Sequence, residues 1–570
     1  MDLKHPLYIV PSISTIQEMI IMSGSSFAGK LAMEDLSQTP VQSLNFDQLL
    51  DKVLRFGAAL KNLGLPERTH LAVIGENRVQ WAITYLTAMA FNYVIVPIDK
   101  NLAANEILNI IYESGAEAIV FSKSFDSLME EEASAIKALK HRISMDILED
   151  ENGFISMTKL IDAAQPAEVA TLPKIDPDEM AEIIFTSGSL GRAKGVMLTQ
   201  KNLATNLVSM TSMIEILPSD RFLSVLPIHH TYECTCGMLC PLYRGSSVHF
   251  ARSLKTIVDD IQNVKATIML GVPLLFDKMF KRISKTIKDD KVKSKIVPPI
   301  VKVTNVLEKL GLKDLKKKVF KEMHEKFGGS VRIFIAGGAA PDPKVALGLR
   351  EFGFTFIQGY GLTETAPIVA LNRLMAFKDD AAGLPLPGVE IKIDSPDAEG
   401  VGEVFVKGDN VMLGYYKNGE LTRDSFEDGF FKTGDLGFID PDGFLHICGR
   451  QKNVIIASNG KNVFPEEIED ILNRNPLVLE SLVYGEKDSK HSEVIAAKVV
   501  LNAETLIEYS EKNNVKIEPE LLQKILAEIV KEANKQLTVY KQIKKFYLQE
   551  KEFEKTTTQK IKRYLVNNNK

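Results

Sequence analysis

The sequence predicts an α/β protein with doubly wound sheets, and two observations support that prediction. Strand-like and helix-like stretches alternate through the first part of the chain. Several predicted strands end in glycine-rich or polar loops, and open α/β sheets bind ligands at the carboxyl ends of their strands. Residues 383–450 instead read as short strands and turns, and the residues from 452 onward read as a small α+β unit.

Predicted helices and strands alternate in the first third of the chain. Residues 44–64 carry apolar side chains at helical spacing and end in glycine, and residues 70–77 read as a strand that leaves through a turn. Residues 81–99 predict a helix that feeds another strand, and residues 116–122 predict a further strand. Residues 123–180 are more polar and contain three prolines, so we expect a connector there.

A loop rich in glycine and hydroxyl groups follows the next predicted strand, residues 181–185, within the segment FTSGSLGRAKGVML. Glycines let several backbone N–H groups point at one anion, hydroxyls add donors, and lysine adds a mobile positive charge. The residues of these types are Thr186, Ser187, Gly188, Ser189, Gly191 and Lys194. We therefore predict a polyphosphate site, although the segment does not fit the Walker A pattern. A surface loop rich in serine and glycine is the alternative.

Two later strands end in candidate ligand residues. Residues 200–216 predict a helix and residues 221–232 a strand that runs into a turn, after which 330–342 and 354–367 each read as a strand with a small or polar end. The candidates are Gly337, Gly338 and Ala339 on the first and Gln358, Gly359, Tyr360, Gly361, Thr363 and Glu364 on the second. Small residues let a flat group approach the backbone, a tyrosine offers a ring face to a base, and a carboxylate beside a threonine can hold Mg²⁺. A turn with a structural tyrosine is the alternative for the second segment.

The last part of the chain adds charged candidates. Asp435 and Arg450 stand out within residues 383–450, because an acid can accept both hydroxyls of a ribose and an arginine can reach a phosphate or the same sugar. Beyond them, we expect helices at about 464–473 and 519–536 and a strand at 494–500. The tail, 554–563, sets hydroxyls beside Lys560, which taken alone reads as a solvated lysine.

The composition is that of a globular protein, with 45% hydrophobic and 25% charged residues. The net charge of −5 gives no reason to expect nucleic-acid binding. Neither a signal peptide nor a transmembrane stretch is visible, so we expect a cytoplasmic protein, and its four cysteines fit a reducing compartment. Cys234, Cys236 and Cys240 cluster near two histidines, but their apolar surroundings favour buried thiols over a zinc site.

Taken together, these motifs resemble those of the adenylate-forming superfamily of acyl- and aryl-CoA ligases, luciferases and peptide-synthetase adenylation domains. TSGSLGRAKGV resembles its phosphate loop, GGAAP and QGYGLTE its adenine and magnesium motifs, FKTGD its ribose motif, GRQKNVII its hinge and TTTQKIKR its catalytic-lysine tail. Within the superfamily, LPIHHTYE, LGVPLLFDKMF and SNGKNVFPEEIE look most like long-chain fatty acid–CoA ligases. Two departures occur: Ser189-Leu190 replaces the usual pair of threonines, and Gln559 stands where glycine usually precedes the lysine.

The resemblance implies a large N-terminal adenylation domain, residues 1–449, with two doubly wound α/β subdomains and a β-rich subdomain. A hinge at residues 450–452, with Lys452 at the family's hinge position, would lead to a small mobile α+β domain at 453–570. That C-terminal domain carries the catalytic lysine and is expected to rotate between the two steps of the reaction.

The resemblance also implies ATP-dependent activation of a fatty acid to acyl-AMP, followed by transfer to coenzyme A. ATP, Mg²⁺ and CoA are therefore the implied cofactors and co-substrates. Lys560 would bridge the substrate carboxylate and the α-phosphate, and Thr363 would contact the α-phosphate. Glu364 and Thr186 would hold Mg²⁺.

The other candidate residues receive binding roles from the same resemblance. Thr186, Ser187, Ser189 and Lys194 would hold the β- and γ-phosphates, with Gly188 and Gly191 in the same loop. Tyr360 would stack on adenine, in a slot formed by Gly337 to Ala339 and Gln358, with Gly359 and Gly361 beside it. Asp435, helped by Arg450, would take the ribose hydroxyls. His230 would sit at the junction of the acyl and CoA channels.

Other substrates and functions stay open at this point. An aryl acid or an acyl-carrier protein could replace the fatty acid or CoA, and a silent nucleotide-binding protein is a third reading, against which Lys560, Glu364 and Asp435 argue. Residues 278–326 carry 16 Lys or Arg against 6 Asp or Glu. Because a long-chain fatty acid resides in membranes, this region is expected either to contact the anionic inner face of a membrane or to be a solvated helical face. The motifs do not predict an oligomeric state.

Overall fold

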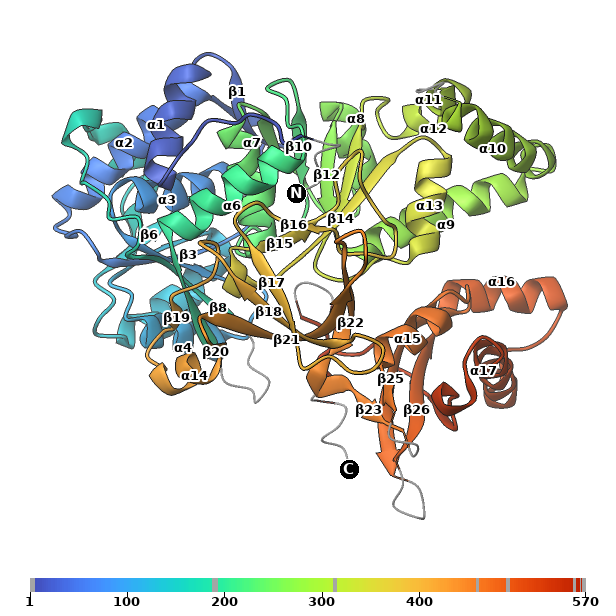
Figure 1. Cartoon of the computed structure of the whole chain (residues 1–570). Coiled ribbons are helices and arrows are strands. Elements are labelled where there is room, and N and C mark those ends of the chain that lie inside the picture. The colour runs from blue at the N-terminus through green and yellow to red at the C-terminus, as the bar shows by residue number, and fades with distance from the viewer. Residues whose placement is uncertain are drawn as a thin grey trace. The chain divides into compact units, whose positions relative to one another are not determined.

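The chain divides into two compact units, which are described separately. The computed structural model describes residues 6–186, 193–310, 315–457, 461–487, 493–556, 560–563 and 565. The first unit comprises residues 1–391 and 406–431, and the second comprises 392–405 and 432–570 (Figure 1). The predicted hinge at 450–452 lies inside the second unit by this division, and it stays a prediction.

Two large β-sheets organise the first unit. The nine-stranded sheet has the spatial order β16 (Leu384–Pro385), β15 (Ile368–Leu371), β14 (Thr355–Gly361), β13 (Ile333–Ala336), β12 (Ile268–Gly271), β10 (Arg221–Ser224), β11 (Ser247–Phe250), β1 (Leu31–Asp35) and β2 (Gln42–Asn45). Its strands from β14 to β1 run parallel, whereas β15 and β16 at one end of the sheet and β2 at the other run antiparallel to their neighbours.

The eight-stranded sheet has the order β19 (Gly414–Tyr415), β9 (Lys194–Thr199), β8 (Met180–Thr186), β4 (Val94–Ile98), β3 (His70–Ile74), β5 (Ala118–Phe121), β6 (His141–Ser144) and β7 (Ile155–Ser156). The strands from β8 to β7 run parallel, and β9 and β19 run antiparallel to their neighbours. The stretch 123–180 was expected to be a connector, and that prediction is wrong in part, because β6 and β7 continue the parallel sheet. These strands were missed because β6 has four residues and β7 has two, and both lie among polar residues, so neither forms a recognisable apolar run.

The parallel strands bury both of their faces. Leu71 and Val73 of β3 point into one hydrophobic core, and Ala72 and Ile74 point into another. On β12 of the other sheet, Ile268 enters the same core as Leu71, whereas Met269 enters a third core. The two sheets therefore share a central core and each has an outer core of its own, which confirms the predicted doubly wound α/β class.

Helices fill the space on both sides of these sheets. They are α1 (Ile16–Ser26), α2 (Phe46–Asn62), α3 (Val79–Ala90), α4 (Ala104–Ser114), α5 (Met157–Ala163), α6 (Gln200–Met213), α7 (Cys240–Tyr243), α8 (Ile257–Val264), α9 (Pro273–Asp289), α10 (Lys293–Lys309), α11 (Leu315–Val319), α12 (Lys321–Lys326), α13 (Pro343–Glu351) and α14 (Gly419–Asp424). Helices α1, α2, α3 and α6 contribute to the central core, whereas α9, α10 and α13 cover the outer face of the nine-stranded sheet. None of the described helices is both long and apolar enough to cross a membrane.

Short helical turns connect several of these elements. They are η1 (Lys123–Phe125), η2 (Leu128–Glu132), η3 (Ala133–Ala135), η4 (Val169–Thr171), η5 (Tyr232–Leu239), η6 (Thr363–Thr365), η7 (Gln451–Asn453) and η8 (Val539–Lys541). A capping box starts α6 directly after β9: the N–H of Asn202 donates to Thr199 Oγ1 at 3.0 Å, and the N–H of Thr199 donates to Asn202 Oδ1 at 2.8 Å. The chain therefore turns from strand to helix without an intervening loop.

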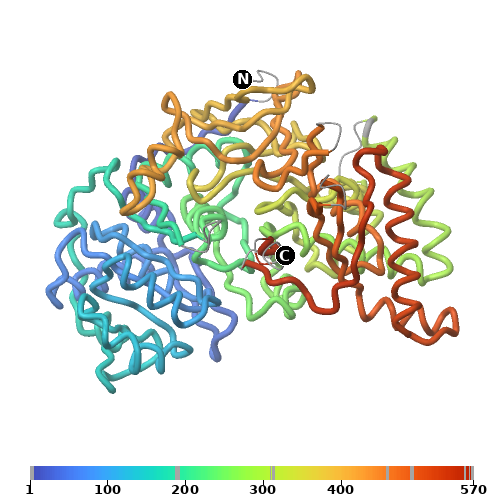
Figure 2. Tube along the Cα trace, turned by 90° about the horizontal axis from the view of Figure 1, so that it is seen from below, coloured from blue at the N-terminus to red at the C-terminus, as the bar shows by residue number. Residues whose placement is uncertain are grey.

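The second unit contains a β-rich part and an α+β part. The five-stranded sheet that lies largely within it consists of β17 (Glu390–Asp394), β18 (Gly402–Lys407), β21 (Phe430–Ile439), β20 (Phe426–Glu427) and β22 (Leu445–Arg450). The α+β part contains β23 (Ile455–Ile456), β24 (Asn462–Val463), α15 (Pro465–Asn473), β25 (Val478–Lys487), β26 (Glu493–Leu501), α16 (Ala503–Asn513), α17 (Pro519–Asn534) and β27 (Lys545–Leu548). Figure 2 shows helices flanking the strands in its orange-to-red trace. The positions of α15, α17 and β26 confirm the elements predicted there.

Candidate active site

Several candidate residues lie at the carboxyl ends of neighbouring parallel strands. His230 follows β10, Gly337 follows β13, and Gln358 is the last residue of β14 that pairs with β13, all in the nine-stranded sheet. Thr186 ends β8 of the eight-stranded sheet. This is the edge at which open α/β sheets place their ligands, so the topology gathers these residues on the side that the sequence predicted.

The antiparallel pair β8 and β9 supports the predicted phosphate loop. Thr186 and Lys194 are cross-strand partners in this pair, so the chain does turn back on itself between them. The predicted loop residues Ser187, Gly188, Ser189 and Gly191 lie outside the described residues. The ladder nevertheless fixes a hydroxyl and a lysine at the two ends of that loop, a combination suited to a polyphosphate.

Tyr415 links Lys194 to Glu364. The ammonium of Lys194 lies 5.1 Å from the centre of the Tyr415 ring, and the Tyr415 hydroxyl donates to Glu364 Oε1 at 2.9 Å. The neighbouring strand β19 holds the tyrosine in place, because it pairs with β9. A carboxylate has about four lone-pair positions, so one hydrogen bond leaves room for a cation. The donor types of Glu364 and Thr186 fit Mg²⁺, which prefers oxygen ligands. Nothing in the sequence LGYYK marked Tyr415 as a site residue.

Glycines at the predicted adenine slot are required by close packing. A Cβ at Gly337 would lie 2.6 Å from the ring of Tyr232, whose hydroxyl donates to the carbonyl of Ile335 at 2.9 Å. A Cβ at Gly361 would lie 1.9 Å from the carbonyl oxygen of Pro367. Gly338 has φ +84°, a conformation that suits glycine. The small residues predicted to admit a flat group are therefore also needed by the protein's own packing.

Gln358 and Tyr360 lie near the end of β14 but in different surroundings. The buried amide nitrogen of Gln358 donates to the carbonyls of Asp379 at 3.0 Å and Ala381 at 2.6 Å. This amide group therefore fixes the loop at 379–381. Tyr360, by contrast, is only partly buried. Its predicted role on adenine stays a prediction.

The second unit brings together three more candidates. Arg450 Nε lies 2.7 Å from Asp435 Oδ1, because β21 and β22 place these two residues opposite each other. Asp435 is almost fully buried, whereas about half of the Arg450 side chain is exposed. Desolvation of its ammonium lowers the pKa of Lys560 most, although the residue as a whole is exposed; the charge of Arg450 lowers that pKa further, and the charge of Asp435 raises it. Lys560, Arg450 and Asp435 thus form one electrostatic group, whereas Lys452 is exposed on η7.

The sequence did not predict a second cluster that joins the two sheets of the first unit. Asp99 follows β4 and His229 and His230 follow β10, and one ligand atom from each of the three lies within 4.8 Å of the others. Asp99 Oδ2 is 3.5 Å from His229 Nε2, and the two imidazole rings are 4.1 Å apart. Two imidazoles and a carboxylate can hold a transition metal, or the carboxylate can orient an imidazole. The signals that could have identified them were an acid directly after β4 and a pair of adjacent histidines in the loop that follows β10.

The cysteine cluster has a different environment. Cys234, Cys236 and Cys240 are buried and free, and burial raises the pKa of each thiol above its usual value. Thiols that resist ionisation are poor metal ligands, because the thiolate is the form that binds. The structure therefore agrees with buried thiols rather than with a zinc site.

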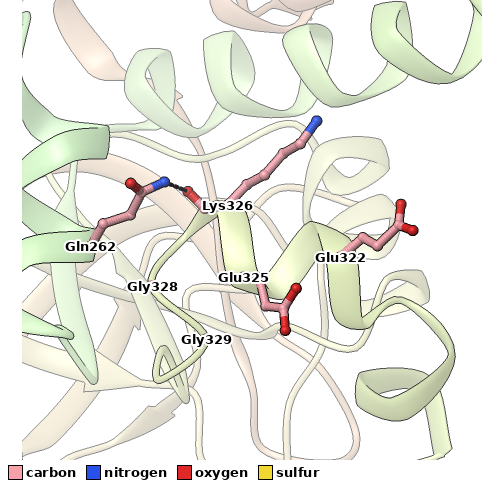
Figure 3. A pocket seen from close by; sticks show the side chains of 6 residues that line it. All are labelled: Gln262, Glu322, Glu325, Lys326, Gly328 and Gly329. Atoms are coloured by element: carbon pink, nitrogen blue, oxygen red, sulfur yellow. Dashed lines mark hydrogen bonds between the residues drawn. The ribbon is translucent and has the colours of Figure 1, made fainter.

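A surface hollow of about 480 Å³ lies elsewhere in the first unit (Figure 3). It is lined by Gln262, Glu322, Glu325, Lys326, Gly328 and Gly329. The amide of Gln262 donates to the carbonyl of Lys326 at 2.8 Å across it. None of the predicted ATP-binding residues lines this hollow, so it is not part of the candidate active site.

Comparisons with known proteins agree with this geometry. The family model described as AMP-binding enzyme matches residues 23–416, and the model of the AMP-binding enzyme C-terminal domain matches residues 467–560. The long-chain-fatty-acid–CoA ligase FadD15 of Mycobacterium bovis is 29% identical, with 89% of this chain and 87% of the relative aligned. The chloroplastic long-chain-fatty-acid–[acyl-carrier-protein] ligase AEE15 of Arabidopsis thaliana is 26% identical, with 81% of this chain and 74% of the relative aligned.

The solved structures confirm the fold. The anthranilate CoA ligase AuaEII, in complex with anthranoyl-AMP, superposes with a TM-score of 0.79 at 20% identity, covering 99% of this chain and 98% of that chain. The first family model alone spans more than half of the sequence. The chain therefore belongs to the AMP-binding enzyme family and is an AMP-forming acid–thiol ligase that uses ATP and Mg²⁺.

Proposed function

We propose that this ligase activates a long-chain fatty acid and transfers the acyl group to CoA. The observation that carries the proposal is the name shared by its relatives, since both the mycobacterial and the plant relative are named for long-chain fatty acids. The segments LPIHHTYE and LGVPLLFDKMF, which resemble that group, support the same substrate.

In the first half-reaction, a carboxylate oxygen of the fatty acid attacks the α-phosphorus of ATP, and the bond to pyrophosphate breaks. The protein supplies alignment and neutralises charge in such a step. Lys560 would stabilise the charge that develops between the carboxylate and the α-phosphate, with Thr363 beside it. Glu364 and Thr186 would hold Mg²⁺, and Asp435 with Arg450 would hold the ribose. The proximity of Asp435, Arg450 and Lys560 within the second unit supports a shared role on the nucleotide.

In the second half-reaction, the CoA sulfur attacks the acyl carbon, a thioester forms and AMP leaves. His230 would stand where the acyl and CoA paths meet. A rotation about residues 450–452 would switch the protein from the arrangement for the first half-reaction to the arrangement for the second. The second unit would present Lys560 in the first step and another surface in the second.

AMP release over a panel of acids, with and without CoA, tests the proposal. We expect AMP release to depend on CoA and to be fastest with long-chain fatty acids. Faster turnover with an aryl acid such as anthranilate would contradict the substrate assignment, and the anthranoyl-AMP complex of a structural neighbour makes that acid the right comparison.

An acyl-carrier protein as acceptor is the second candidate, because one relative is named for that acceptor. The same assay with holo-acyl-carrier protein in place of CoA separates the two. Exchange of labelled pyrophosphate into ATP, which needs only the first half-reaction, would rule out a silent nucleotide-binding protein.

A further inference from the structure

Helix α10 of the first unit exposes apolar side chains on one face. We call these residues the apolar stripe; they are Val292, Ile296, Pro299, Val303, Val306 and Leu310, counting the residues just before and after the helix. Except for the proline, which is also exposed, they are 48–74% exposed. The opposite face, which includes Val301 and Thr304, is buried and packs toward the outer core of the nine-stranded sheet.

The spacing makes the stripe continuous. At 3.6 residues per turn, its six positions fall within an arc of about 80° and span about 27 Å along the helix. Val301 and Thr304 lie on the far side of the helix. A helix that packs through one face normally presents polar residues on the other, so a continuous apolar face on the outside marks an interaction surface.

Lysines flank the stripe on both sides. Lys295 and Lys302 border one side, and within the described chain neither takes part in an ion pair. Lys293 borders the other side, 3.7 Å from Glu322. The whole region 278–326 has a net charge of +10, while the protein as a whole has a net charge of −5. Apolar side chains bordered by lysines are the pattern of helices that lie in a membrane interface.

The basic face of this region differs from the one expected from the sequence. Lys316 is buried and lies 2.5 Å from Glu308 Oε2, so the run Lys316 to Lys318 does not form one open lysine face. On α12, two glutamates line the hollow of Figure 3, and Lys321 lies 3.6 Å from one of them, Glu325. Two of the five lysines on α11 and α12, Lys316 and Lys321, are therefore paired with glutamates, and α10 carries the surface of interest.

We infer that the apolar stripe docks the protein reversibly on an anionic bilayer. A second copy of the chain is a poorer partner, because an antiparallel two-fold contact through the middle of this stripe would bring Lys302 close to its own copy. Anionic headgroups neutralise the lysines that flank the stripe, and the acyl layer accepts the valines and Ile296. The inference rests on the proposed function in one respect, since docking would give access to a fatty acid held in the membrane.

Co-sedimentation with vesicles tests the inference without fatty acid, ATP or CoA, so its outcome does not depend on the substrate assignment. The vesicles are phosphatidylcholine alone, or equal parts of phosphatidylcholine and phosphatidylglycerol. We expect binding to the anionic vesicles that weakens at high salt. The double variant Val303→Glu/Val306→Glu should bind about tenfold more weakly. Val303→Ser/Val306→Ser, which adds no charge, should also lose binding.

The matched control is Tyr112→Glu/Leu148→Glu, which makes the same charge change at residues that are 66% and 73% exposed near the eight-stranded sheet. It should bind as the unmodified protein does. Circular dichroism checks that all variants fold. Equal binding of the stripe and control variants, or no preference for anionic vesicles, would overturn the inference. A stripe variant that changes only the oligomeric state in light scattering would instead assign this face to a protein contact and also overturn it.

Discussion

Lys560 is the single residue on which adenylation is expected to depend most. In the second unit its ammonium interacts electrostatically with Arg450 and Asp435, which form an ion pair with each other. We expect Lys560→Ala to slow acyl-AMP formation by about two orders of magnitude or more, because a charge contact made in the transition state is lost. Thioester formation from preformed acyl-AMP should change far less. Lys551→Ala, at an exposed lysine shortly before the tail, is the control. Equal loss in both half-reactions would rule out the role proposed for Lys560.

Tyr415 is expected to position Glu364 rather than to touch the substrate's reacting atoms. Tyr415→Phe removes the hydroxyl that donates to Glu364 Oε1 and keeps the ring near Lys194. If Glu364 holds Mg²⁺, the concentration of Mg²⁺ needed for half-maximal pyrophosphate exchange should rise about tenfold, as for other lost partners of metal ligands. Tyr416→Phe, which loses only a 3.4 Å contact to the carbonyl of Ser114, is the matched control. If the Mg²⁺ requirement is unchanged, Tyr415 does not contribute to Mg²⁺ binding.

Strand β8 carries a buried acid whose titration should make stability depend on pH. Burial raises the pKa of Glu182 from 4.5 to about 8, and the hydroxyl of Tyr85 on α3 donates to its Oε2 at 3.1 Å. The folded state binds this proton more tightly than the unfolded state, so this residue's contribution to stability falls as pH rises from about 4.5 to about 8.

The variant Glu182→Gln mimics the protonated carboxyl and should remove that dependence. Melting temperatures should be measured from pH 5 to pH 9. The melting temperature of the variant should rise relative to that of the unmodified protein as pH rises, with the largest difference above the pKa of Glu182, about 8. The melting temperature of Glu420→Gln, at an exposed position of α14, should depend on pH in the same way as that of the unmodified protein. A constant difference across the pH range would mean that Glu182 does not titrate in this way.

The sequence predicted the elements that bury apolar runs and missed the contacts between distant segments. Buried parallel strands such as β3 and β12 read as apolar runs, and the residues at strand ends could be placed at one edge by topology alone. The hydrogen bond between Tyr415 and Glu364 joins residues 51 positions apart, and no local sequence pattern predicts such a contact. The apolar stripe of α10 was hidden for another reason: periodicity shows that a helix has an apolar face but not which face turns toward the core.

At the scale of the whole molecule, the change from the first half-reaction to the second is expected to depend on the segment between the two family matches. The first match ends at residue 416 and the second begins at residue 467, so the predicted hinge at Lys452 lies between them. Lys452 is exposed on the short turn η7. A change that fixes the backbone there should act on motion more than on the fold.

Lys452→Pro fixes φ at one value and so restricts rotation about this segment. We expect it to retain most of the pyrophosphate exchange, which needs only the adenylating arrangement, and to lower CoA-dependent AMP release by about tenfold or more, because the second arrangement is no longer reached. Lys452→Ala keeps the backbone free and removes the same side chain, so it separates backbone motion from any contact of the ammonium. If Lys452→Pro turns over normally with CoA, the backbone at residue 452 does not move between the steps. If Lys452→Ala is as slow as Lys452→Pro, the side chain rather than the rotation carries the effect.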